Sequence, residues 1–156
     1  MRILGLTLAY LIYFSSTPWE FAGAADGFQA DYIGGTEGSL PGKTDGKLRT
    51  NGQDVLSFQA KKGLVQVSYA KINLIEYGQK VDRRYVAAFL ISPLFLLSKS
   101  RRHFVTVGYT DDDGRQQAMV FQVSKGSVRS VLVSLEARTG LKVQFQDGEA
   151  RKAGKG

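Results

Sequence analysis

The side chains that could carry out catalysis are few in this chain, and they form no known catalytic motif. His103 is the only histidine, and the chain has no cysteine. With no cysteine and no nucleophile motif beside it, His103 supports neither a catalytic triad nor an all-histidine metal site. We interpret His103 as the first residue of a strand, and we expect no catalytic residue, no metal and no cofactor.

A run of three carboxylates, Asp111-Asp112-Asp113, is followed by Gly114 and is the most acidic stretch of the chain. Calcium loops need oxygen ligands spaced along the loop, and three consecutive aspartates lack that spacing. Apolar alternating segments flank the run on both sides. We therefore interpret it as the turn of a hairpin.

The segment from Glu37 to Thr44 has the glycines and the final Lys-Thr of a phosphate-binding P-loop, but the spacing is wrong. That motif needs four residues between its glycines, so that backbone amides surround the phosphate. Gly38 and Gly42 are separated by three residues, and no parallel strand-helix-strand pattern follows. The segment is predicted to be a loop without a nucleotide site.

The most unusual stretch is RRYVAAFLISPLFLLSKSRRHF, residues 83 to 104, in which twelve mostly apolar residues lie between two pairs of arginines. Val86 to Leu97 is too short to cross a bilayer as a single helix, and Ser92-Pro93 interrupts it. Proline lacks an amide donor and disfavours helix in the residue before it. The segment is therefore predicted to form two short apolar arms, an insertion at residues 86–97.

Three interpretations of these arms remain open. The arms pack in the core or under the C-terminal helix, or they dip into one membrane leaflet, or they dock onto a protein or a second copy of the chain. The contact residues would be Phe89, Leu90, Ile91, Leu94, Phe95, Arg83, Arg84, Lys99, Arg101 and Arg102. Residues 78 to 104 hold six Lys or Arg and one Asp, which is +5 of the formal charge of +7. An apolar segment with a basic rim is typical of an interfacial anchor.

The first residues have the pattern of an export signal. Arg2 precedes the apolar run Ile3 to Phe14, and Ala22-Gly23-Ala24 is a small-residue cleavage motif. As a helix this run would span about 18 Å, well short of the roughly 30 Å hydrocarbon core. We predict a signal peptide at residues 1–24 and a periplasmic or secreted protein. The basic charge then favours a membrane surface or an envelope protein as partner, rather than nucleic acid.

The rest of the chain reads as an antiparallel, mainly β domain at residues 25–147. Short alternating segments are predicted at 28–33, 47–50, 54–59 and 64–77, with the last slipping near Ala70. Gly34-Gly35 should stop the first strand, Asn51-Gly52 should form a two-residue hairpin turn, and Lys61-Lys62-Gly63 the next turn. A further hairpin pairs 104–109 with 117–123, and 141–145 forms a short last strand. Tyr69, Tyr77 and Tyr109 are expected to be half-buried.

One amphipathic helix is predicted from Ser127 to Thr139. Val128, Val131, Leu132 and Leu135 recur at i, i+3, i+4 and i+7, with Ser127 as the N-cap and Gly140 as the C-terminal stop. Residues 148–156 offer no apolar pattern to bury, and we expect a disordered basic tail.

The strand segment 68–78, the hairpin 104–123 and the helix 127–139 together resemble the pleckstrin-homology-like superfold, in particular its small bacterial and GRAM-type members. The resemblance covers most of residues 28 to 140 and implies an open barrel or sandwich, capped by the helix, that binds lipids, peptides or proteins. Members that bind phosphoinositides carry basic residues on the first hairpin, which Lys43, Lys47 and Arg49 loosely match. Alternation puts Lys47 and Arg49 on one strand face, where both could meet one anionic group.

We therefore expect an exported, non-enzymatic binding module that associates peripherally with a membrane or an envelope complex through its apolar loop. The alternative is a structural or assembly protein that uses the same loop to form a homo-oligomer or to dock a partner.

Overall fold

The computed structural model describes residues 27–36, 40–81 and 102–155. The signal-peptide prediction and the apolar insertion at 86–97 lie outside these residues. Within the described part, strands dominate, as the alternating segments predict.

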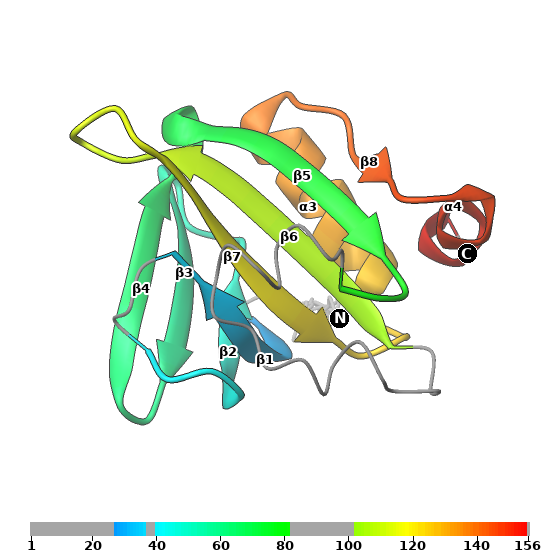
Figure 1. Cartoon of the computed structure of the whole chain (residues 1–156), viewed down its shortest axis with the longest axis horizontal. Helices are drawn as coiled ribbons and strands as arrows, with labels where there is room; N and C mark the ends of the chain where they lie inside the picture. Colours follow the sequence, from blue (N-terminus) through cyan, green and yellow to red (C-terminus); the bar gives the residue numbers. More distant parts are fainter. Residues whose placement is uncertain (1–26, 37–39, 82–101, 156) are drawn as a thin grey trace, which may run out of the picture.

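Eight strands form a single mixed sheet. In chain order they are β1 Phe28–Gly35, β2 Thr44–Arg49, β3 Val55–Ala60, β4 Gly63–Ser68, β5 Ile72–Gly78, β6 His103–Thr110, β7 Gln116–Val123 and β8 Gln144–Phe145. They lie in the order β4-β3-β2-β1-β7-β6-β5-β8. All neighbours are antiparallel except β5 and β8. Figure 1 shows the sheet bent, so that β2, β3 and β4 turn away from the plane of β5, β6 and β7.

The bends have local causes. The 3-10 turn η1, Tyr69–Lys71, separates β4 from β5 at the place where the alternation slips. In β1 the register with β7 shifts between Tyr32 and Gly34, which marks a bulge. The strand ends at Gly35, within the glycine pair expected to stop it; the bulge lets β1 pair with β7 as far as Gly35, while its earlier residues also pair with β2.

The two turns predicted in the first half of the chain behave differently. Ala60 pairs with Gly63, so Lys61 and Lys62 form a two-residue turn as predicted. Between β2 and β3 the innermost pair is Arg49 with Ser57, and Gly52 has no positive φ, so the two-residue Asn51-Gly52 turn is wrong. The connection is longer because Thr50 is buried, and its carbonyl accepts a hydrogen bond of 2.9 Å from the Tyr69 hydroxyl.

The main core lies between the inner face of the bent sheet and helix α3, Val128–Thr139. The four buried residues of α3 are the predicted stripe, Val128, Val131, Leu132 and Leu135. Gly140 ends the helix with a φ of 73°, as a C-terminal stop requires. Ser127 occupies the N-cap position but makes no capping bond with its side chain; its hydroxyl lies 2.8 Å from that of Ser124 instead.

The aromatic residues join the two halves of the sheet. The rings of Tyr32, Phe58 and Phe121, from β1, β3 and β7, lie within 6.2 Å of one another between centroids. Tyr69, Tyr77 and Tyr109 are buried rather than half-buried, because each points to the inner face. Burial is also the main reason that the pKa values of Tyr69 and Tyr77 are raised.

The expectation of a disordered C-terminal tail is wrong, because residues 148–155 form a helix. Helix α4, Gly148–Lys155, follows β8 and buries Ala150 and Gly154. Asp147 caps the helix by accepting a 2.6 Å hydrogen bond from the amide of Ala150. Only small residues face inward, so the segment carries no apolar stripe that a sequence pattern would reveal.

Candidate functional site

The outer face of the sheet carries a second apolar cluster, separate from the main core. It consists of Ile33, Val81, Phe104 and Val120, with Leu74 packed against it. Alternation separates the two faces: on β7, Phe121 belongs to the main core and its neighbour Val120 to the outer cluster. All four residues of the outer cluster are at most 4 % exposed.

This outer cluster marks the place where the apolar insertion leaves and rejoins the sheet. Val81, just after β5, is 3 % exposed within it. At the other end, Arg102 donates a 3.2 Å hydrogen bond from Nη1 to Oε1 of Gln122, an outward-facing side chain of β7. Of the ten predicted contact residues only Arg102 is described; the rest lie in the part of the chain outside the description.

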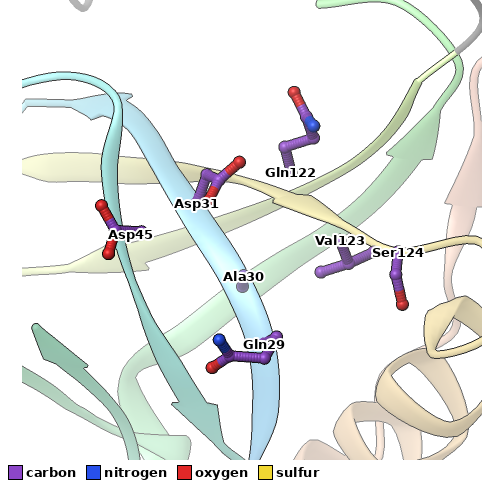
Figure 2. Close-up of a pocket in the computed structure, with 7 residues that line it drawn as sticks. All are labelled: Gln29, Ala30, Asp31, Asp45, Gln122, Val123 and Ser124. Carbon is purple, nitrogen blue, oxygen red and sulfur yellow. The ribbon is translucent and has the colours of Figure 1, made fainter.

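A polar hollow of about 220 Å³ lies across β1, β2 and β7, next to Arg102's partner Gln122. Figure 2 shows its polar side chains: Gln29 and Asp31 on β1, Asp45 on β2, and Gln122 and Ser124 on or after β7. Asp31 and Asp45 are direct partners in the register of β1 and β2. Two carboxylates opposite each other repel, which makes the hollow unsuited to an anion.

The predicted anion site lies beside this hollow. Lys47 and Arg49 flank the fully buried Leu48 on β2, so they share the outer face. Asp45 is on that face too, two residues before Lys47. Lys43 precedes the strand with a φ of 63° and lines no part of the hollow. The structure therefore brings together two of the three predicted cations, with two carboxylates close by.

His103 begins β6, as expected, and its contacts are structural. Its Nδ1 lies 2.6 Å from the Tyr77 hydroxyl, and the two rings stack with centroids 6.1 Å apart. Burial, and then the positive charge of Lys125, lower the pKa of His103. No hydroxyl or thiol nucleophile other than the Tyr77 phenol is hydrogen-bonded to this imidazole among the described residues.

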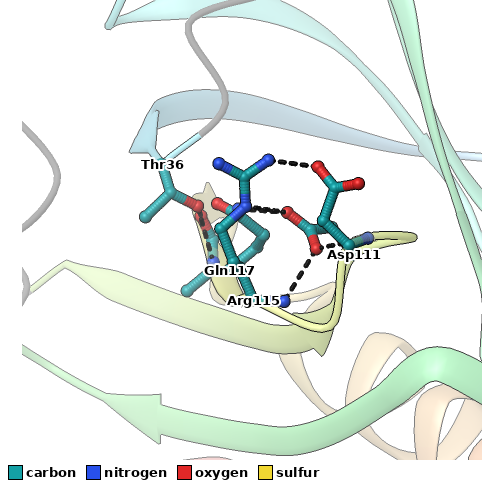
Figure 3. A network of polar contacts seen from close by, with 6 residues as sticks. Thr36, Asp111, Arg115 and Gln117 are labelled. Atoms are coloured by element: carbon teal, nitrogen blue, oxygen red, sulfur yellow. Dashed lines mark hydrogen bonds and ion pairs between the residues drawn. The ribbon is translucent and has the colours of Figure 1, made fainter.

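The acidic run forms the hairpin turn between β6 and β7. Oδ1 of Asp111 accepts hydrogen bonds from the amides of Asp113 and Arg115, at 3.0 and 2.8 Å, and Oδ2 accepts one from Gln117 (Figure 3). These bonds, led by the one from the Arg115 amide, lower the pKa of Asp111. Arg115 also forms an ion pair with Asp113. Within the described ranges no three acidic, histidine or cysteine side chains are grouped to hold a metal.

One hollow was missed by sequence reasoning. It lies between α3, β8 and α4 and has a volume of about 390 Å³, which is larger than that of the hollow across β1, β2 and β7. The wall formed by α4 was predicted to be disordered, so no site was expected there. The one feature of the sequence that indicates this hollow is Val133, an apolar residue of α3 that lies outside the buried stripe.

Comparisons with known proteins give no family: no protein-family model matches the chain, and no curated protein matches it. Within the described residues, none of the helices has the length and apolar character needed to cross a membrane.

Proposed function

We propose that the chain is an exported, non-enzymatic binding module of the pleckstrin-homology-like superfold that associates peripherally with a membrane or an envelope complex. The fold proposal is supported by the strand order β4-β3-β2-β1-β7-β6-β5 and by α3, which directly follows β7 and packs on the inner face. β8 and α4 are additions to the arrangement that the resemblance implies.

The observation that carries the functional proposal is where the basic and apolar segment joins the sheet. It is inserted between β5 and β6, which are hydrogen-bonded neighbours and need only a short turn. Both described ends, Val81 and Arg102, contact the outer face, away from α3. An insertion of this composition at one end of an outer face would meet a membrane without disturbing the main core.

The magnitudes are sufficient for peripheral binding. Full burial of an apolar side chain such as Phe89 or Phe95 contributes about 1.5–3 kcal/mol. Each Lys or Arg near an anionic surface adds roughly 1 kcal/mol. Two or three side chains at the surface, with the basic rim, would hold a domain of this size on anionic lipid.

Co-sedimentation of residues 25–156 with phosphatidylglycerol vesicles tests the proposal. Arg83→Gln with Arg84→Gln should weaken binding at low salt, because exposed charges are screened over about 8 Å at physiological ionic strength. Lys61→Gln with Lys62→Gln is the matched control, since it removes two adjacent cations from the turn between β3 and β4. Equal losses in both variants would contradict a role for the insertion.

The alternative function, assembly through the same loop, predicts a different result. In that case the chain forms a homo-oligomer or holds an envelope protein, and vesicles do not bind it. A sizing measurement beside the co-sedimentation distinguishes the two functions.

Export is a separate proposal with its own test. N-terminal sequencing of the mature protein should give Ala25 as the first residue, because Ala22 and Ala24 occupy the positions that signal peptidase reads. A retained Met1 would contradict it.

An anion site at Lys43, Lys47 and Arg49 is a weaker proposal, because Asp31 and Asp45 lie beside Lys47 and Arg49.

A further inference from the structure

The hollow between α3, β8 and α4 combines an apolar floor with a basic rim. Its apolar lining comes from Leu132 and Val133 on α3 and from Val143 and Phe145 around β8. Arg129 on α3 and Lys155 at the end of α4 line it as well. Figure 1 shows β8 and α4 on the side of α3, at the end of the sheet where β8 pairs with β5.

Helix α3 presents two adjacent stripes that share Leu132, and only the first is wholly buried in the core. The buried stripe is completed by Leu135, whereas Arg129, Leu132, Val133 and Glu136 form a second stripe at i, i+3, i+4 and i+7. Val133 on the second stripe is 56 % exposed, and it is one of two large apolar side chains exposed in the described part of the chain. The second stripe therefore leaves apolar surface uncovered.

The opposite wall is fixed in place. Gly154 of α4 packs so closely on Phe145 that a Cβ atom added to it would lie 2.7 Å from the phenylalanine ring. The Phe145 ring in turn meets Tyr77 edge-on at 6.1 Å. Glu136 ties the two walls together, because its carboxylate accepts a 2.9 Å hydrogen bond from the amide of Val143.

The charges of the lining favour a negatively charged ligand. Neither Arg129 nor Lys155 has a hydrogen-bond or ion-pair partner among the described residues. Glu136 is the one carboxylate of the lining, and one of its oxygens is committed to Val143. The lining is therefore net positive, with two cations that are unpaired within the described part of the chain and an apolar floor between the two helices.

We propose that this groove binds a single-chain amphiphile with a carboxylate head group, a fatty acid. The apolar chain would lie against Val133, Val143 and Phe145, and the carboxylate would meet Arg129 and Lys155. The volume of about 390 Å³ is in the range of pockets that hold small molecules, about 300–1,000 Å³. The site is distinct from the insertion at 86–97, so it does not depend on the proposed membrane contact.

Titration of the isotope-labelled protein with decanoate, below its micelle concentration and followed by NMR, tests this proposal. Decanol and decyltrimethylammonium share the apolar chain and differ only in the head group. We expect saturable shifts in α3, β8 and α4 with decanoate, weaker binding of decanol, and no saturable binding of decyltrimethylammonium. Decanol or the cationic probe binding as tightly as decanoate would overturn the assignment.

Two matched substitutions locate the binding. Val133→Glu should weaken decanoate binding at least about tenfold, because it removes apolar contact and adds a like charge. Leu64→Glu is the control, since Leu64 on β4 is similarly exposed, at 50 %, and far from the groove in the sheet order. Equal losses in the two variants would show unspecific adsorption and overturn the proposal.

A second variant tests the basic rim of the groove and leaves its apolar floor unchanged. Arg129→Gln with Lys155→Gln should weaken decanoate about three- to tenfold and leave decanol unchanged, as expected for two exposed ion pairs. Both positions are exposed, so the melting temperature should not change. An unchanged decanoate affinity in this variant would also overturn the proposal.

Discussion

The two faces of the strands β1, β7, β6 and β5 differ in what covers them. The inner face meets α3 and forms the larger cluster, with Phe121 at its centre among the rings of Tyr32 and Phe58. In the described part of the chain, the outer face carries a smaller cluster, of four buried apolar residues, grouped where the insertion joins the sheet. The difference indicates that the inner face supplies most of the stability, whereas the outer cluster lies where the chain leaves β5 and returns to β6.

Phe121 and Phe104 give the sharpest test of this difference. They lie on the paired strands β7 and β6, with Phe104 opposite Gln122, and they point to opposite faces. Phe121→Ala should lower the free energy of unfolding by about 3–5 kcal/mol, as for buried phenylalanines in a closed core. Phe104→Ala should cost clearly less, because its cluster is small. Chemical denaturation of both variants checks this, and equal losses would mean that the outer face is a core of the same quality.

The next largest effect concerns the attachment of α4 to the inner side. Gly154→Val places a side chain where Phe145 and Tyr77 already lie, within 3.3 Å of the position of its Cβ. Such overpacking typically costs about 1–3 kcal/mol. Gly148→Val is the control, because the space around Gly148 is open. Hydrogen exchange should show faster exchange in α4 for Gly154→Val alone; protected α4 amides in this variant would contradict the packing.

The smallest expected effect is a pH dependence that arises where β5 ends and β6 begins. Burial and Lys125 hold the pKa of His103 below its usual value of 6.5, so the unfolded chain binds a proton first as the pH falls. The contribution of His103 is therefore complete above pH 6.5 and is lost as the pH falls through that value towards the folded pKa. Within the described residues, the charged groups that act on Tyr77 and His103 are Asp147, near Tyr77, and Lys125, near His103. His103→Gln should give a flatter stability profile between about pH 7.5 and 5. A parallel profile would contradict the assignment.

Much of the inner face is predictable from the sequence, because its signals are local. The stripe Val128, Val131, Leu132 and Leu135 repeats with the helical period, and Gly140 marks its end. Lys61-Lys62 turns as predicted, because the register of β3 with β4 places Ala60 opposite Gly63. Asn51-Gly52 does not form the predicted turn, because Thr50 is held by Tyr69 from a distant part of the chain.

The sites are less predictable, because they depend on contacts between distant segments. Helix α4 docks through Ala150 and Gly154, and small residues leave no periodic apolar signal. Without α4 there is no groove beside α3, so neither Arg129 nor Val133 stands out in the sequence. The carboxylate Asp31 reaches the side of Lys47 only through the pairing of β1 with β2. The predicted anion site could not include this neighbour.

We propose that the inner face holds the fold while the insertion between β5 and β6 binds membrane. Phe89→Ser with Phe95→Ser tests it most directly, with the melting temperature and vesicle co-sedimentation measured on the same samples. We predict an unchanged melting temperature and a loss of binding to phosphatidylglycerol vesicles, because apolar groups that contact lipid contribute little to folding. A large fall in melting temperature with unchanged vesicle binding would contradict the claim and make the insertion part of the core.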